Sequence, residues 1–258
     1  SDDFDAGSGE VVIGSAVSGI DDLSIQSATD ASFQSVALTG DFITNSRLAG
    51  ALDFSGAVSA GRVDVSAVTL LLNDGISASN DLGIDTTTGA DLRGAITAGD
   101  SISIAGPLDL AGDIESVSGG VMFGGLARLS SDASITANAG LVQATAIQTN
   151  GSELALRAEE IDLVGGAASG SGSGSVLLQP ATDGAPIRVG ATATGGAGLD
   201  LSQVDLDALA PSLSSVTIGR GTGSHSVLFG NATLRTPTTV RAPSGIIEVG
   251  GSIDSSGN

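Results

Sequence analysis

"GAVSAGRVDV" at residues 56–65 returns twice in altered form, as "GISASNDLGI" at residues 75–84 and as "GAITAGDSISI" at residues 94–104. A glycine begins each version, so the step between versions is 19 residues both times. A fixed period of about 20 residues is typical of repeat proteins in which each unit packs on its neighbours. The physical reason for this period decides the fold.

One aliphatic position recurs between small residues in successive units. The steps between its members are 18, 20, 18 and 21 residues. The members are Val58, Ile76, Ile96, Ile114 and Ile135. A similar step extends the series backwards to Leu38 and Ile20. We expect these side chains to lie above one another along the axis of a solenoid.

Two further series consist of alternating apolar residues. The first is Val63/Val65, Leu82/Ile84, Ile102/Ile104 and Val121/Phe123. The second, which is less regular, is Leu70/Leu72, Leu92, Leu108/Leu110 and Leu126/Leu129. Alternation over three to five residues predicts short strands with one buried face. Gly, Asn and Asp separate the strands, and these residue types adopt the positive φ that sharp corners require.

The three series together predict an all-β fold, a three-faced parallel β-helix with about 19–20 residues per turn. Each strand then pairs in parallel with its counterpart one turn away, at a spacing of about 4.8 Å. Thirteen or so turns make a rod on the order of 60 Å long. A sandwich or barrel is the competing all-β fold, but it does not require a step near 19 residues. A narrow core also explains a chain with 6 Phe and no Tyr or Trp.

We expect a single continuous β-helix over residues 1–258, with two irregular segments. "GGAASGSGSGS" at residues 165–175 predicts a flexible loop excursion, because strand patterns resume directly after it. "LDLSQVDLDALAP" at residues 199–211 breaks the strand rhythm.

The second irregular segment has the pattern of a short helical turn near residues 202–210. Val204, Leu206 and Leu209 suit such a turn. Ser202 and Asp205 have the spacing of a capping pair. Pro211 is expected to end the turn.

Charge and composition exclude several classes of function. The net charge is -20, and all nine basic residues are arginine. Nucleic-acid binding needs a basic surface, so neither nucleic acid nor an anionic membrane is an expected partner. The chain has no cysteine, so it has no disulfides and no cysteine metal site. It also has no apolar stretch of the length of a membrane span, so membrane insertion is not expected. The first ten residues lack the pattern of a signal peptide, so the chain is either cytosolic or exported with its signal removed.

The sequence yields no catalytic, cofactor-binding or metal-binding residue that we would assign. His225 is the only histidine, and "GTGSHSVLF" predicts that it lies exposed in a turn. The carboxylate pairs that could form a catalytic dyad are Asp21/Asp22, Glu159/Glu160 and Asp205/Asp207. Enzymes that cleave polysaccharides on a β-helix also present basic and aromatic residues, whereas here Tyr and Trp are absent and the arginines are scattered. An enzyme is therefore the least favoured hypothesis.

Calcium is the one cofactor whose motifs deserve a direct comparison in an acidic solenoid. "GGAGLD" at residues 195–200 is a single near match to the calcium-binding G-G-x-G-x-D repeat, and no EF-hand pattern occurs. We therefore expect no cofactor.

One region resembles a known family. "GSVLLQPATDGAPIRVGATATGGAGLDLSQVDLDALAPSLSSVTIGRGTGSHSVLFG" at residues 174–230 is similar to the filamentous-haemagglutinin-like exoproteins of bacterial two-partner secretion. The likeness rests on Leu178-Gln179-Pro180, on the Leu-Ser-x-x-Asp-Leu segment from Leu201 to Leu206, and on the strand from Val216 to Gly219.

The resemblance implies a right-handed parallel β-helix, export across the outer membrane, and an adhesive role at the bacterial surface. The expected function is therefore the non-catalytic shaft of a secreted, adhesin-like or fibre-forming protein. The alternative is a subunit of an extracellular filament or biofilm matrix. Neither end of the sequence has the pattern of a capping helix, so we expect either a longer chain or self-association of rods end to end. Cell-surface or matrix components are the other expected partners.

Overall fold

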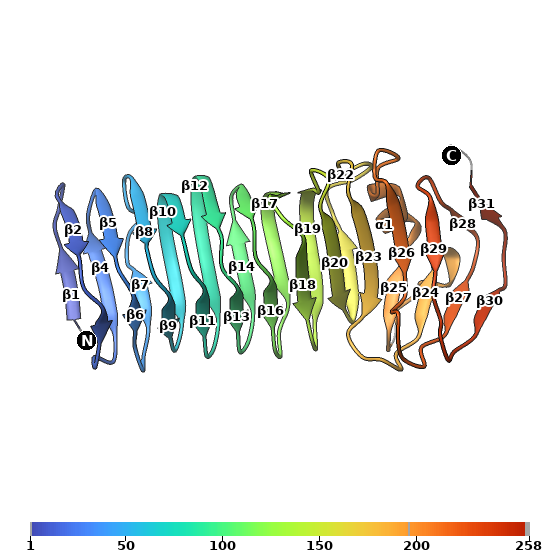
Figure 1. The fold of residues 1–258 in the computed structure, drawn as a ribbon, viewed down its shortest axis with the longest axis horizontal. Coiled ribbons are helices and arrows are strands. Elements are labelled where there is room, and N and C mark those ends of the chain that lie inside the picture. The colour runs from blue at the N-terminus through green and yellow to red at the C-terminus, as the bar shows by residue number, and fades with distance from the viewer. Residues whose placement is uncertain (1, 196, 256–258) are drawn as a thin grey trace.

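The computed structural model describes residues 2–195 and 197–255 as a rod of about 13 stacked turns. Figure 1 shows the chain coiling from one end of the rod to the other, with its two termini at opposite ends. Nearly every described element is a short strand, and all strand pairs are parallel over three faces, so the predicted β-solenoid is confirmed.

The first two faces form one continuous sheet, because four long strands bend from one face to the next. Face 1 contains β1 (Asp2–Asp5), β4 (Leu23–Ser27), β7 (Phe42–Thr44), β10 (Val63–Leu72), β12 (Leu82–Leu92), β14 (Ile102–Ala105), β17 (Val121–Leu129), β19 (Leu141–Gln148) and β21 (Glu160–Leu163). Face 2 contains β2 (Glu10–Ile13), β5 (Asp30–Phe33), β8 (Ala51–Phe54), β15 (Leu108–Leu110), β22 (Gly170–Ser171) and the second halves of β10, β12, β17 and β19.

Face 3 is a ladder of eleven strands without interruption. Its members are β3 (Val17–Ser18), β6 (Val36–Ala37), β9 (Val58–Ala60), β11 (Ile76–Ala78), β13 (Ile96–Ala98), β16 (Ile114–Ser116), β18 (Ala133–Ala137), β20 (Glu153–Ala158), β23 (Ser175–Pro180), β26 (Ser215–Ile218) and β29 (Thr238–Val240).

The aliphatic column on face 3 has the register that the repeat predicts. In order along the axis, the paired residues are Val58, Ile76, Ile96, Ile114 and Ile135. Each is at most 2% exposed. The period of the sequence is therefore the length of one coil.

The backward extension of this column to Leu38 and Ile20 is wrong. Val36 pairs with Val58, and Val17 pairs with Val36, so the true column lies two to three residues earlier. The cause is a loop at residues 45–50 between β7 and β8, which lengthens that turn. The loop places the fully buried side chain of Leu48 in the core, so it adds to the packing instead of projecting outward.

The first series of alternating pairs is confirmed residue by residue, from Val63 to Phe123. The second series fails at its last member. An irregularity in β17 between Phe123 and Leu126 shifts the strand, so Ala127 and not Leu126 pairs with Leu108. Ala127 is buried, and Leu126 is partly exposed.

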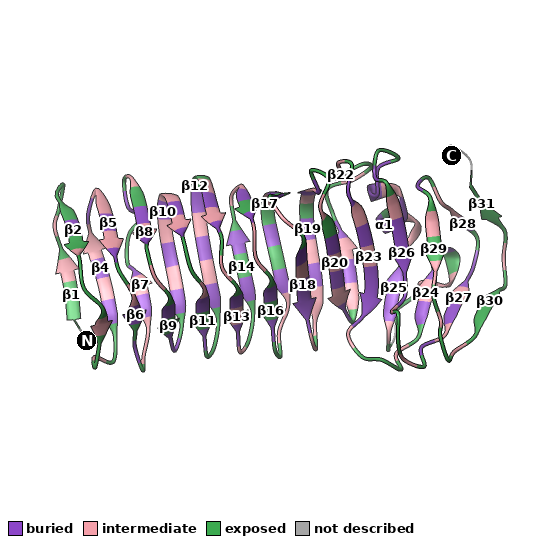
Figure 2. Ribbon diagram, viewed as in Figure 1, coloured by how far each residue is buried: buried purple, intermediate pink, exposed green. Residues whose placement is uncertain are grey.

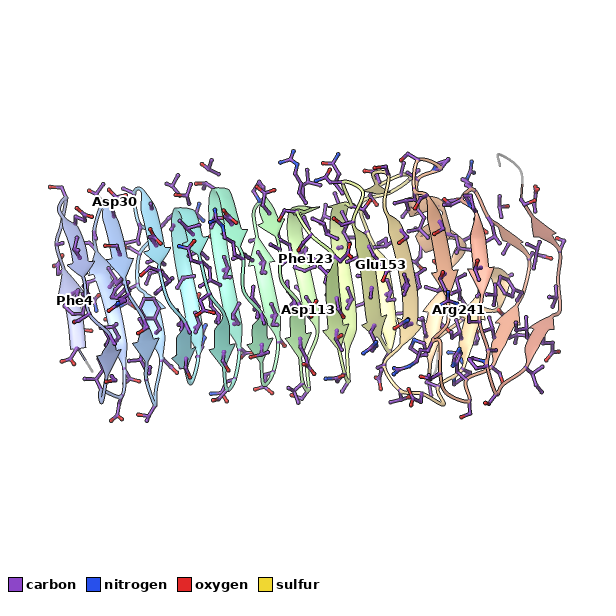
Figure 3. All side chains as sticks on the ribbon, in the orientation of Figure 1. Phe4, Asp30, Asp113, Phe123, Glu153 and Arg241 are labelled. Atoms are coloured by element: carbon purple, nitrogen blue, oxygen red, sulfur yellow. The ribbon has the colours of Figure 1, made fainter. Side chains whose placement is uncertain are left out.

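Buried and exposed residues alternate along the strands, so the core is a narrow, filled column of stacked side chains (Figures 2 and 3). Three phenylalanines widen the core near the N-terminal end. The ring of Phe33 lies 5.5 Å from that of Phe42 and 5.5 Å from that of Phe54, and Phe42 lies 5.4 Å from Phe54. Edge and offset contacts at these separations stabilise aromatic clusters beyond the area they bury.

The glycines that begin the repeat were expected to adopt a positive φ at the corners, and this expectation is wrong. Close packing between coils is the reason that glycine is needed at these positions. A Cβ on Gly94 would lie 2.3 Å from the backbone carbon of Asp74, and a Cβ on Gly56 would lie 2.5 Å from the carbonyl oxygen of Gln34. Neither residue has a positive φ. Successive coils therefore approach so closely at this corner that only a hydrogen fits.

Aspartates at the corners join each coil to the next. The Oδ1 atom of Asp41 accepts a hydrogen bond from the backbone N–H of Arg62 at 3.0 Å, and Asp81 accepts one from Ser101 at 3.0 Å. Asp113 and Asp132 accept the same kind of bond at the corner before face 3, from the backbone N–H groups of Ser134 and Glu153. Part of the acidic composition is thus explained by backbone N–H groups that need an acceptor at each corner.

The order of strands reverses once, near the C-terminal end. The sheet there runs β25 (Leu199–Leu201), β24 (Ile187–Val189), β27 (Val227–Phe229) and β30 (Ile247–Val249), so β24 lies beyond β25 although it comes earlier in the sequence. β25 contacts β21 but forms no ladder with it. The remaining described elements are the 3-10 helix η1 (Gly190–Thr192), α1 (Gln203–Ala208), β28 (Ala232–Thr233) and β31 (Ile253–Asp254).

The two irregular segments differ in content. The residues from 165 to 169 form a loop, but Gly170 is buried and pairs with Ile147 of the preceding coil. The helical turn lies at Gln203–Ala208 and has the expected capping box of Ser202 and Asp205. Leu206 and Leu209 are buried, whereas Val204 is 64% exposed and does not share their apolar side.

Candidate binding face and the C-terminal polar network

His225 is fully buried, so the prediction of an exposed turn residue is wrong. Its Nε2 atom lies 2.8 Å from the carbonyl oxygen of Arg241 and 3.2 Å from the backbone nitrogen of Arg220. Gly219 and Gly245 make room for it, because a Cβ on either would lie within 2.8 Å of an atom of His225. No local sequence pattern could have revealed this, because the residues around His225 come from separate parts of the sequence.

The carboxylates of two of the three pairs, Asp21/Asp22 and Asp205/Asp207, each bind a separate partner within the protein. Asp21 accepts a hydrogen bond from the Thr39 hydroxyl at 2.5 Å, and Asp22 accepts one from the backbone of the next coil. Asp205 is 5% exposed and accepts the backbone N–H of Leu163 at 3.1 Å in addition to its capping bonds. Asp207 forms an ion pair with Arg235 at 3.0 Å.

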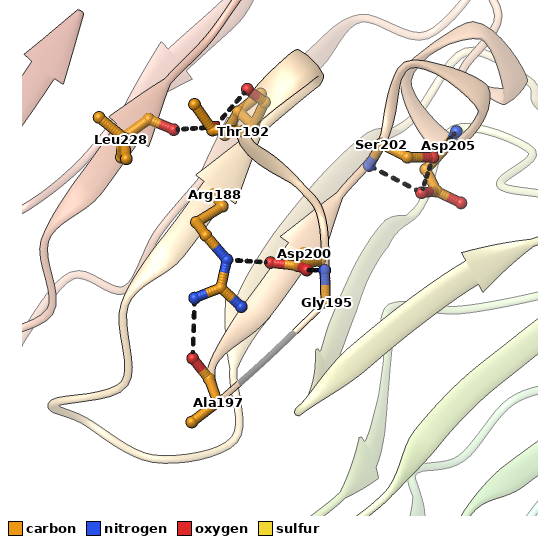
Figure 4. A network of polar contacts seen from close by, with 9 residues as sticks. Arg188, Thr192, Gly195, Ala197, Asp200, Ser202, Asp205 and Leu228 are labelled. Carbon is orange, nitrogen blue, oxygen red and sulfur yellow. Dashed lines mark hydrogen bonds and ion pairs between the residues drawn. The ribbon is translucent and has the colours of Figure 1, made fainter. Parts of the chain in front are cut away.

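The "GGAGLD" segment ends in an ion pair inside the protein (Figure 4). Arg188 of β24 donates from Nε to Asp200 of β25 at 2.6 Å and from Nη1 to the carbonyl oxygen of Ala197 at 3.0 Å. The second oxygen of Asp200 accepts the backbone N–H of Gly195 at 2.5 Å. The carboxylate thereby fixes the loop between β24 and β25, while Gly196 lies outside the described residues.

Glu160 lies at the start of β21, beside the place where the ladder of face 1 is interrupted. Its pKa is raised to about 7, first by burial and then by the negative charges of Asp200, Asp205 and Asp162. Arg188 opposes this shift. The junction between β21 and β25 therefore brings several carboxylates together, and its charge changes near neutral pH.

Within residues 2–195 and 197–255, no group of three or more His, Cys, Asp or Glu side chains is arranged to hold a metal ion. In the same part of the chain, no helix has both the length and the apolar character needed to cross a membrane.

Face 2 has a column of outward side chains, one from each coil. The β-ladder pairs its members from coil to coil without a gap, from Val12 to Ser171. In order, the column is Val12, Ser32, Asp53, Leu71, Asp91, Asp109, Arg128, Gln148 and Ser171.

Two open hollows of the surface lie along this same face, and a third lies beside α1. The hollow nearest the N-terminal end has a volume of about 280 Å³ and includes Ser32 and Asp53. The middle hollow, of about 260 Å³, includes Asp91, Asp109 and Arg128. A larger hollow of about 510 Å³ lies between α1 and the last described coils.

The hollow beside α1 is lined by polar side chains. Gln203 donates from Nε2 to Asp207 at 3.0 Å, and Arg235 donates to the same carboxylate oxygen. Asn231 lies opposite, and its Oδ1 accepts the backbone N–H of Ser252 at 2.9 Å. The sequence analysis did not identify the face 2 column, because its outward residues are of different types and form no recurring pattern.

A search of family models, of curated proteins and of solved structures found no match to this chain.

Proposed function

We propose that this chain is the non-catalytic shaft of a secreted, adhesin-like protein of the cell surface. The observation that carries the proposal is the uninterrupted eleven-strand ladder of face 3, from β3 to β29. A ladder of this kind resists bending because every coil is hydrogen-bonded to both neighbours. A stiff rod with a strongly negative surface stays soluble and extended, which suits a part that holds a binding surface away from the cell.

Electron microscopy of the purified protein at low and high concentration tests the shaft. We expect single short rods of uniform length at both concentrations. Antibody labelling of intact source cells, with permeabilised cells as the control, tests the location. Compact particles without a long axis, or labelling that appears only after permeabilisation, would contradict the proposal.

The alternative is a filament in which rods associate end to end. The observation that favours it is the exposure of the last described coil. Ile247 and Val249 occupy core positions, paired with the buried Val227 and Phe229, and yet they are 49% and 55% exposed. Apolar side chains at the end of a ladder favour pairing with another strand, whether that strand is a further coil of the same chain or belongs to a second rod.

Sedimentation over a wide range of protein concentration distinguishes the two functions. For the filament we expect axial association that is lost in Ile247→Glu and retained in the control Val204→Glu, whose side chain is exposed on α1. A monomer at every concentration would exclude the filament and leave the shaft.

A further inference from the structure

We propose that face 2 binds a neutral, hydroxyl-rich polysaccharide chain that lies along the axis of the rod. This inference goes beyond the shaft and does not depend on it, because a single rod with this face would bind whether or not it belongs to a larger adhesin.

The shape of the face favours an elongated ligand. Eight steps of about 4.8 Å separate the ends of the column from Val12 to Ser171, so the column is roughly 38 Å long. The two smaller hollows lie along this column, and the third lies beyond it beside α1, where Leu209 bridges to Gly170 of β22. Hollows of about 300–1,000 Å³ with a few directed polar groups are typical of ligand sites, and two of nearly this size along one column fit a chain better than a small molecule.

The column has no aromatic side chain on which a sugar ring could stack, so recognition would rest on the hydroxyl groups of the ligand, and the mixture of donors and acceptors favours such groups. In the middle hollow, Asp109 has no bonding partner among the described residues, and Arg128 uses Nε on Gln148 at 3.3 Å while its two Nη groups have no such partner. An acceptor and a donor side by side match a hydroxyl, which both donates and accepts. A polycation would meet Arg128, and a polyanion would meet Asp109 together with the net charge of -20.

A buried oxygen in the N-terminal hollow supports the same ligand class. The Oδ1 atom of Asp53 is buried and has no hydrogen-bond partner in the described part of the chain. An unsatisfied buried carboxylate oxygen is costly, and a rotation of the Asp53 side chain would bring this oxygen to a hydroxyl in the hollow beside Ser32, which would supply the missing donor.

The hollow beside α1 repeats the arrangement with different residues. Asp207 and Arg235 form an ion pair at 3.0 Å, and Gln203 also donates to the Asp207 carboxylate. The guanidinium keeps its Nη groups for a ligand, since its Nε is the atom that pairs with Asp207. Acceptor and donor again lie together in one hollow.

An extended polypeptide is less favoured as the occupant. Peptides bind sheets most effectively by adding a strand to a free edge. The face 2 strands from β5 to β19 are paired on both sides, so they offer a peptide no backbone groups. A polysaccharide needs side-chain partners alone.

Calorimetric titration of the monomeric protein tests the proposal with three probes: a neutral glucose hexamer with β1,4 linkages, a cationic glucosamine hexamer and heparin. We expect the neutral hexamer to bind, and to bind more tightly than the corresponding trimer. Asp109→Ala and Arg128→Ala should each weaken binding about tenfold or more. The matched controls are Glu115→Ala on face 3 and Arg62→Ala at a corner, and both should bind as the original protein does.

Several outcomes would overturn the proposal. Binding of the glucosamine hexamer alone, lost on addition of salt, would indicate attraction to the acidic rod as a whole. Binding of heparin alone would contradict the charge argument. Equal weakening by the face 2 variants and by their controls would place the site elsewhere, and the absence of heat with all three probes would exclude the class. Circular dichroism of each variant confirms that the fold is retained.

Discussion

At the scale of single residues, the side chain of Ile96 is fully buried between Ile76 and Ile114 of the neighbouring coils. We expect Ile96→Ala to lower the free energy of unfolding by about 2–5 kcal/mol, because it removes core contacts and leaves a cavity. Ile96→Asp should cost more, since it buries a carboxylate without a partner. Urea denaturation measures both, with Thr97→Asp on the outer surface of the same strand as the control. Equal stability of Ile96→Asp and Thr97→Asp would refute the stacked register.

Glycine at the corner allows a second test at this scale. We expect Gly94→Ala to lower the free energy of unfolding by about 1–3 kcal/mol, because the added methyl group would meet the backbone of the preceding coil. Gly14→Ala is the matched control, since a Cβ there has nothing within 4 Å and the residue has no positive φ. Thermal unfolding compares the two, and a similar Tm for both variants would mean that the coils separate at little cost.

At the scale of elements, the junction between β21 and β25 differs from the ladders around it, because the two strands are in contact without a ladder and carboxylates lie close together there. Between pH 4.5 and about 7, Glu160 holds its proton in the folded protein and loses it in the unfolded chain. The folded state then binds more protons, so the contribution of this group to stability falls as the pH rises through that window.

The corresponding prediction is a pH dependence that one substitution removes. From pH 5 to pH 8, this contribution lowers the Tm of the original protein, and Glu160→Gln should lose that part of the change because its amide does not titrate. Glu159→Gln, at the exposed neighbouring position, is the control and should retain the full dependence. If the Tm of Glu160→Gln changed with pH in parallel with that of the original protein, the charge of Glu160 would have no effect on stability.

At the scale of the whole molecule, charge is unevenly distributed along the rod. Residues 1–60 contain nine acidic residues and one arginine. We expect the Tm to rise as sodium chloride is increased from about 10 to about 200 mM, because the Debye length falls from about 30 Å to less than 10 Å and repulsion between coils is screened. At pH 3, where most carboxylates are protonated, the same salt increase should have a much smaller effect. A larger effect at pH 3 would contradict this account.

The sequence allowed the fold to be predicted where one residue type occupies one place in every coil. The column from Val58 to Ile135 is the best example, because an apolar side chain must lie inside every turn. The prediction failed where a coil changes length or shape, as at the buried Leu48 loop and at Leu126 in β17. His225 and the face 2 column could not be predicted, since their surroundings come from neighbouring coils that share no local pattern with them.

The reversed order of β24 and β25 has a consequence for how the chain reaches this structure. Up to β23, each coil can assemble on a finished template as the chain lengthens from its N-terminus. β24 has no such template, because its two ladder partners are β25 and β27, and both come later in the sequence. Growth of the rod must therefore pause at Ile187–Val189 until Leu199–Leu201 arrives. In pulse-labelled hydrogen exchange, the amides of β24 would become protected after those of β23, and simultaneous protection would show that the pause does not occur.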